Sequence, residues 1–177
     1  MIPFLLFLCH RRGTTTIRAS PDVVKNTIMD FEVSTKWDAL LREIIVLEQI
    51  DGHTDIVLMK YVAEHCLLRE ARDFVVLMHW FKRAEDNSIV IVAHSIDYPK
   101  CPPQVGYTRG DMICCGYLIS PLKDNYDISR VTQLATVNLN KVTAFMANYV
   151  VRTEPVCLHR LRRFIHERYD RVSGSSG

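Results

Sequence analysis

This sequence has little excess charge, no long apolar run and no cysteine pairing motif. Its 22 Lys and Arg offset 20 Asp and Glu, so the formal net charge is only +2. A nucleic-acid binder needs a clear basic excess to neutralise phosphates, so no nucleic-acid partner is expected. The N-terminal apolar run ends at Cys9, too short to cross a bilayer, and it lacks a preceding basic segment and a small-residue cleavage site. A secretory signal peptide is therefore not the favoured interpretation.

The six cysteines occur without a C-x-x-C pair or a regular framework. Cys114 and Cys115 are adjacent, so on a strand their side chains would point to opposite faces of the sheet. This pattern favours reduced thiols in a cytoplasmic chain over a disulfide scaffold.

Catalytic and metal-binding motifs are also missing. The sequence contains no G-x-S-x-G, H-E-x-x-H or Walker-type run, and its seven histidines have no ligand spacing. Cys114 and Cys115 could supply a thiol to a Cys/His pair, but small apolar residues in a strand are the simpler interpretation. We therefore expect a non-catalytic domain with no metal and no cofactor.

What the sequence does contain is a helix, a series of strands and a terminal helix. Its 177 residues are enough for one domain with a sizeable core. Ser20-Pro21-Asp22 predicts a helix start with Ser20 as the capping hydroxyl, and Ser34 predicts a second cap before a short turn around Trp37. Short polar connections favour an antiparallel meander. Strands rich in Val, Ile, Leu and aromatics are predicted at residues 43–50, 55–63, 74–81, 88–95, 112–119 and 129–138.

The C-terminal segment predicts an amphipathic helix. Pro155 indicates a kink or a restart within it. Arginines make this end basic, which suits an anionic membrane surface as well as a solvated outer face, and both interpretations stay open. A first apolar face, at helical spacing, is formed by Val142, Phe145, Met146, Tyr149 and Val150. A second apolar stripe is formed by Leu158, Leu161, Phe164 and Ile165.

Four short motifs follow one another between residues 72 and 119. They are Arg-Asp-Phe-Val (72–75), Ser-Ile-Asp-Tyr-Pro (95–99), Arg-Gly-Asp (109–111) and Gly-Tyr-Leu-Ile (116–119). In this order and spacing the segment resembles the START domain, the lipid-transfer module related to the steroidogenic acute regulatory protein. The resemblance implies an α+β helix-grip fold, in which a curved antiparallel β-sheet wraps around a long C-terminal α-helix. It also implies a carrier or sensor that holds one hydrophobic ligand, a lipid or acyl-type molecule, in an internal tunnel.

The N-terminal region departs from this family. START domains begin with a further helix and two strands ahead of the strand expected here at residues 14–19. Residues 1–13 do not resemble that region, so the resemblance implies an N-terminally truncated or alternatively started form. We expect an atypical segment at 1–13, the lipid-binding domain at 14–171 and a flexible tail of linker composition at 172–177.

Ligand-lining residues are expected on the inward face of the sheet and on the terminal helix. By the resemblance, Met59 and Met78 fall where sterol-binding START domains carry an acid and an arginine, so sterol recognition of that kind is not expected. Methionine suits an adaptable cavity wall, but the same methionines would also fill a solid core, and this choice stays open. The residues expected to line the ligand are Met59, Met78, Trp80, Met112, Phe145, Met146 and Tyr149.

Arg72, Asp73, Tyr107 and Arg109 are expected to form strand-end ion pairs or a gate beside the loop at 99–108. Arg109 could instead hold a lipid headgroup, because a guanidinium binds such groups bidentately. Two further functions stay open: a regulatory START module of an acyl-CoA thioesterase or another multidomain protein, and a ligand-free scaffold for protein interactions. An aromatic cage for a quaternary ammonium would draw on Trp80, Tyr107, Tyr117 and Tyr149.

Overall fold

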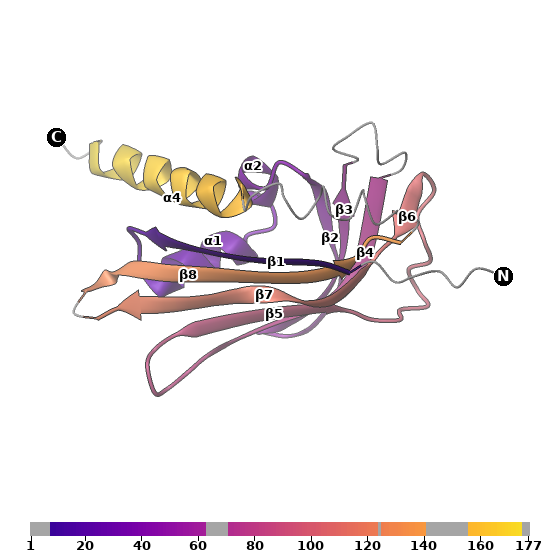
Figure 1. Ribbon diagram of the computed structural model, residues 1–177, viewed down its shortest axis with the longest axis horizontal. Helices are drawn as coiled ribbons and strands as arrows, with labels where there is room; N and C mark the ends of the chain where they lie inside the picture. The colour runs from indigo at the N-terminus through magenta and orange to yellow at the C-terminus, as the bar shows by residue number, and fades with distance from the viewer. Residues whose placement is uncertain (1–7, 63–70, 124, 141–155, 175–177) are drawn as a thin grey trace.

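The computed structural model describes residues 8–62, 71–123, 125–140 and 156–174. Most of them belong to one curved, eight-stranded sheet (Figure 1). Along the main path the strands follow the order β1-β8-β7-β5-β4-β3-β2, and every neighbouring pair in it is antiparallel. These strands are β1 (Leu8–Ile17), β2 (Leu41–Asp51), β3 (Thr54–Tyr61), β4 (Ala71–Lys82), β5 (Ile89–Ser95), β7 (Asp111–Leu122) and β8 (Asn125–Asn138).

The antiparallel meander predicted from the sequence is confirmed, and two strand features differ from the expectation. β1 begins at Leu8 and ends at Ile17, whereas the expected strand spans 14–19. β6 (Tyr107–Arg109) overlaps the end of the segment predicted as a loop, residues 99–108, and pairs in parallel with the start of β4. It is only three residues long, so period-2 alternation could not reveal it.

Three helices are described, and their starts match the sequence only in part. α1 (Pro21–Met29) begins at the predicted proline, but Ser20 makes no capping hydrogen bond through its side chain. α2 (Ser34–Trp37) has Val33 at its N-cap, and the Ser34 hydroxyl donates to the carbonyl of Asp30 at 3.0 Å. The prediction of two hydroxyl caps is therefore wrong. α4 (Val156–Gly174) contains the second predicted stripe, while the first stripe lies outside the described residues.

The helices lie on one face of the sheet, which we call the inner face (Figure 1). At one end of it, large side chains from β1, β5, β7 and β8 pack against α1 and α4 and are almost completely removed from solvent. Burial of this apolar surface is the main source of stability for the fold, at roughly 25 cal/mol per Å². The residues of this packed end are Ile17, Val24, Ile89, Ile119, Val131, Leu161 and Ile165.

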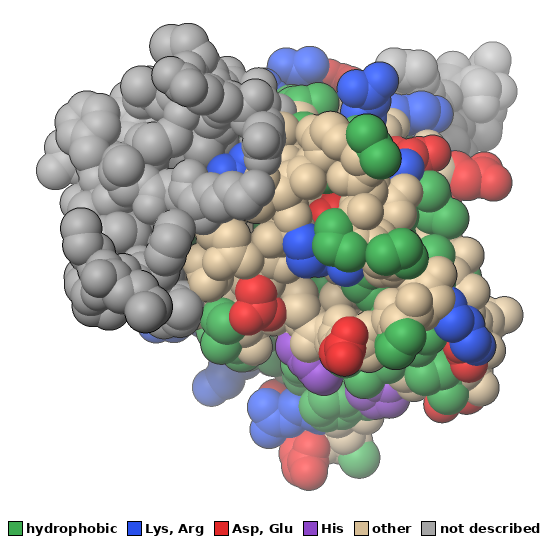
Figure 2. All heavy atoms as spheres, turned by 90° about the vertical axis from the view of Figure 1, so that its right-hand side faces the viewer, with side chains coloured by type: hydrophobic (Ala, Val, Ile, Leu, Met, Phe, Trp, Pro, Cys, Tyr) green, Lys and Arg blue, Asp and Glu red, His purple; other side chains and the backbone are tan. Residues whose placement is uncertain are grey.

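The opposite, outer face of β3 and β4 carries a second, smaller apolar cluster. Ile56, Leu58 and Val75 are buried there together with Cys101, which lies in the loop before β6. Burial on both faces explains why β3 and β4 read as continuous apolar runs rather than as alternating ones. On the end of the molecule shown in Figure 2, hydrophobic side chains lie interspersed with charged and histidine side chains.

Candidate functional site

The middle of the inner face is crossed by a row of mostly small side chains. The strand register places Arg11 of β1 opposite Ala135, Ala135 opposite Cys115, Cys115 opposite Ala93, and Ala93 opposite Met78. Two alanines and a cysteine fill little of the space above the sheet. The described side chains along this row are therefore mostly small, in contrast to the large ones at the packed end.

A polar chain lies in the next row. The Gln133 side-chain amide donates to the Tyr117 hydroxyl at 3.1 Å. The Cys157 thiol, in the first turn of α4, donates to the Gln133 carbonyl oxygen at 3.1 Å. These bonds connect α4 to the centre of the sheet through a chain of polar side chains.

Two inward tyrosines are deep and yet keep accessible surface. Burial raises the pKa of Tyr61 and of Tyr117 well above the usual value for a phenol. Both side chains nevertheless remain partly exposed. The Tyr61 ring meets the Phe74 ring edge-on, with centroids 5.7 Å apart. The two phenols are therefore deep but not sealed from solvent, and both stay protonated at neutral pH.

The inward cysteines are thiols of low reactivity. Burial raises the pKa of Cys115 and that of Cys157 to about 11 each, so neither forms the thiolate that a nucleophile or a metal ligand needs. Cys114 points outward and is exposed, as the strand alternation predicted. Cys66 lies outside the described residues, and no other cysteine is disulfide-bonded.

The structure gathers part of the expected lining set. Met59, Met78 and Met112 belong to the inner cluster, and each is 8% exposed. Trp80 is partly buried at the α1 end. The Lys25 ammonium lies 4.0 Å from the centroid of its ring, and the centroid of the His53 ring lies 4.4 Å from that of Trp80. Phe145, Met146 and Tyr149 lie outside the described residues.

The Arg-Asp and Arg-Gly-Asp motifs hold the loop before β6. Asp73 is fully buried and receives two hydrogen bonds from Arg109, each 3.0 Å long. The backbone amide of Gln104 also donates to Asp73, at 3.1 Å, and Arg109 donates to the carbonyls of Cys101 and Pro102. The pair therefore fastens residues 101–104 to the edge of the sheet.

The neighbouring motif residues serve packing as well. Arg72 is buried and donates to the carbonyls of Leu139 and Asn140, at 2.6 and 3.2 Å, beyond the end of β8. Tyr107 of β6 is partly buried, and its ring centroid is 6.0 Å from the Lys60 ammonium. A side chain at Gly110 would collide with the Phe74 ring, which explains why glycine stands between Arg109 and Asp111.

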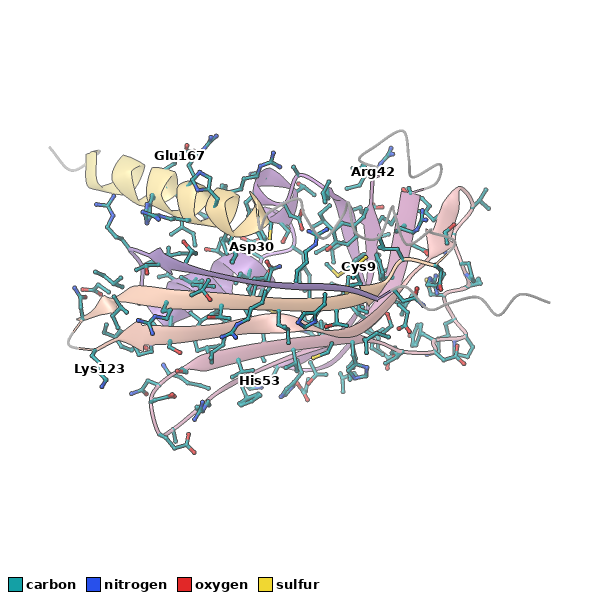
Figure 3. The ribbon with its side chains drawn as sticks, viewed as in Figure 1. Cys9, Asp30, Arg42, His53, Lys123 and Glu167 are labelled. Carbon is teal, nitrogen blue, oxygen red and sulfur yellow. The ribbon has the colours of Figure 1, made fainter. Side chains whose placement is uncertain are left out.

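Sequence reasoning missed most of the polar residues of the inner face. Arg11, Tyr61, Gln133 and Asp38 were not singled out, because each is a common surface residue when taken alone. Strict alternation along β8 carries the signal, since it places Gln133 and Ala135 on the face of Val131. Cys9, labelled in Figure 3, is buried in the inner cluster.

The described ranges contain neither a metal-binding cluster nor a membrane-spanning helix. Within them no three His, Cys, Asp or Glu side chains lie close enough to hold a metal ion. No helix in this part of the chain is long and apolar enough to cross a membrane.

Comparison with known proteins identifies the family. A START domain family model matches residues 11–152, so the chain belongs to the START domain family. It is 30% identical over 105 residues to human StAR-related lipid transfer protein 6, covering 58% of this chain and 46% of that protein. It is 29% identical over 126 residues to Arabidopsis thaliana Protein ENHANCED DISEASE RESISTANCE 2-like, covering 69% of this chain and 17% of that protein. The chain thus spans less than half of either relative.

The fold matches solved structures of the same family. The structure of human StAR-related lipid transfer protein 5 superposes with a TM-score of 0.80 and 19% identity. The match covers 89% of this chain and 76% of that one. At this level of identity the likeness establishes the fold, and the ligand has to be argued from the residues of the inner face.

Proposed function

We propose that this protein binds one lipid or acyl-type molecule against the middle of its inner face. The observation that carries the proposal is the pair Tyr61 and Tyr117, which lie deep in the molecule and still keep accessible surface. The row of small side chains through Ala135, Cys115 and Ala93 supplies the room. A space with this lining, largely apolar and with a few convergent polar groups, suits a lipid.

The energetics favour an alkyl chain as the occupant. Each methylene group that leaves water for an apolar site gains about 0.8 kcal/mol. Met59, Met78 and Met112 offer flexible, polarizable walls that adapt to chains of different shape. No chemical step is needed, because the two deep thiols stay protonated and the family relatives are described as lipid transfer proteins.

The chain can serve as the lipid-sensing part of a longer protein. It aligns with only 17% of its Arabidopsis relative, which shows that the domain occurs inside much larger chains. In that setting, bound lipid would report to the rest of the protein rather than be delivered. A regulatory module and a free carrier therefore share the same binding step.

Native mass spectrometry of protein purified from cells tests the proposal. We expect a mass shift corresponding to one bound lipid, which organic extraction removes and which a fresh lipid restores. Protein that carries no lipid and takes up none after extraction would favour the ligand-free scaffold instead.

A further inference from the structure

Arg11 is a charged residue on the inner face of the sheet. Along β1 the side chains of Cys9 and Ile17 are buried in the inner cluster, and Arg11 has the same parity. The strand register agrees that the Arg11 side chain points inward, because Arg11 lies opposite Ala135, and Ala135 lies opposite the inward Cys115. Its neighbour Arg12 points outward and is exposed, while Arg11 is partly buried.

The Arg11 guanidinium is close to the polar groups of the interior. Although burial raises the pKa of Tyr61 and of Cys157, Arg11 lowers both through its charge. It also acts on Asp38, whose pKa burial raises. The Asp38 carboxylate accepts a hydrogen bond from the backbone amide of Leu40 at 3.1 Å. Within the described residues, Arg11 forms no ion pair with Asp38 or with any other carboxylate. A partly buried guanidinium without an anion in contact is costly, and a bound anion would relieve that cost.

Two neutral donors lie in the same region. The Tyr117 hydroxyl accepts a hydrogen bond from Gln133, so its own hydrogen is available to a ligand. The Tyr61 hydroxyl has no acceptor among the described residues, and it is near enough to Tyr117 to influence that residue electrostatically. One guanidinium and two phenols match an oxygen group of one negative charge, whereas a dianion would leave a charge in excess.

We propose that Arg11, Tyr61 and Tyr117 hold the monoanionic oxygen group of an acyl lipid whose tail lies along Ala135, Ala93 and Met78. This inference rests on the proposed function and adds the charge class of the ligand to it. The carboxylate of a fatty acid and the phosphodiester of a phospholipid share this chemistry, so the test includes both.

The test compares lipids that carry an anionic oxygen group with analogues that lack one, on the delipidated chain. A fluorescent fatty-acid methyl ester serves as the neutral probe, and it is displaced by oleate, methyl oleate, dioleoylphosphatidylcholine or dioleoylglycerol. Arg11→Gln should lower the affinity for oleate or for phosphatidylcholine by about tenfold or more, because a hydrogen-bonded charge is lost. The affinity of the same variant for each neutral competitor should stay within about threefold of that of the unaltered chain. Arg12→Gln, the adjacent outward position, should leave all four unchanged.

Two further variants protect the test from a folding defect. Arg11→Lys keeps the charge and should retain most of the preference for the anionic lipid. Tyr61→Phe keeps the ring and should lower, by several-fold, only the affinity for the lipid with the anionic oxygen group. Loss of affinity for phosphatidylcholine but not for oleate would support the site and identify the phosphodiester as its ligand.

The failures of the two proposals are distinguishable. Binding of the neutral probe to the unaltered chain, with no selective loss in Arg11→Gln or Tyr61→Phe, would overturn the anion site and leave lipid binding in place. Absence of any probe binding would overturn both.

Discussion

Inward side chains along β8 change from large and fully buried to small within a few residues. Val131 is completely buried at the packed end, while Ala135, four positions further along the same face, is partly exposed. Protein interiors are normally packed as densely as organic crystals, so we propose that the protein alone does not fill its interior at this place. The choice between a cavity wall and a solid core, which the methionines left open, can therefore be tested at Ala135.

We expect Ala135→Phe to change the free energy of unfolding by less than about 1 kcal/mol, because the ring enters open space, whereas overpacking a filled core costs about 1–3 kcal/mol. Leu134→Phe, one residue along and on the outer face, is the matched control. Urea unfolding of the delipidated variants measures the difference. A loss of about 2 kcal/mol or more in Ala135→Phe alone would mean that the site is filled by protein.

The Asp73–Arg109 pair gives a second prediction at the level of single residues. Asp73→Asn keeps the shape but removes the charge that Arg109 contacts twice, so we expect a loss of about 2 kcal/mol in the free energy of unfolding. The value is below that for a fully buried pair because the Arg109 side chain is 26% exposed. Chemical denaturation would show this loss, and Asp111→Asn, which is partly exposed, serves as the control. A change below about 0.5 kcal/mol would show that the loop does not depend on this pair.

At the level of secondary-structure elements, the sequence predicted the strands with long apolar patterns and missed those without. β3 and β4 were recognisable because both of their faces are buried and their residues are β-branched or large. β1 begins earlier than expected because Arg11, Arg12 and Gly13 interrupt its apolar pattern, and its extent depends on pairing with β8. Long-range pairing of this kind cannot be read from a local window, and the polar part of the site was missed for the same reason.

α4 presents a basic outer surface. Leu158, Leu161 and Ile165 are buried against the core, which leaves Arg160, Arg162 and Arg163 exposed. We propose that this surface contacts anionic membranes. Each basic residue near such a surface contributes about 1 kcal/mol, and salt screens the attraction.

Vesicle co-sedimentation checks this prediction. The double variant Arg162→Glu and Arg163→Glu should bind phosphatidylserine vesicles at least about tenfold more weakly than the unaltered chain. Arg42→Glu, on β2 away from α4, is the control (Figure 3). If all three proteins bound phosphatidylserine vesicles equally, or if the unaltered chain bound neutral vesicles as well as anionic ones, the basic surface of α4 would have no role in membrane contact.

In the molecule as a whole, apolar side chains pack on both faces of the sheet. The outer cluster around Val75 and the anchored loop at 101–104 support the sheet from its outer side. The family fold was predictable from four short motifs, and Gly110, which must lie against Phe74, illustrates why such motifs are informative. The ligand was not predictable from them, because Tyr117 is the only motif residue among the proposed ligand contacts, and Arg11 and Tyr61 lie outside the motifs.

The inward methionines Met59 and Met78 predict a preference for acyl lipids over cholesterol. Met59 and Met78 offer a sterol hydroxyl no strong hydrogen bond, and an unpaired buried hydroxyl costs about 1–3 kcal/mol. In competition, phospholipid or fatty acid should displace a labelled sterol at least about tenfold better than cholesterol does. Tight, stoichiometric cholesterol binding would contradict the role assigned to the two methionines.

The measurement that bears most directly on lipid binding in the interior is lipid occupancy of the matched pair Ala135→Phe and Leu134→Phe. Delipidated chains are incubated with the lipid that co-purifies with the unaltered protein, and native mass spectrometry counts the bound molecules. We predict one lipid per chain in the unaltered protein and in Leu134→Phe, and at least about tenfold lower affinity in Ala135→Phe, because the ring occupies the space of the ligand. Equal occupancy in all three proteins, or no bound lipid in any of them, would contradict a lipid site on the inner face.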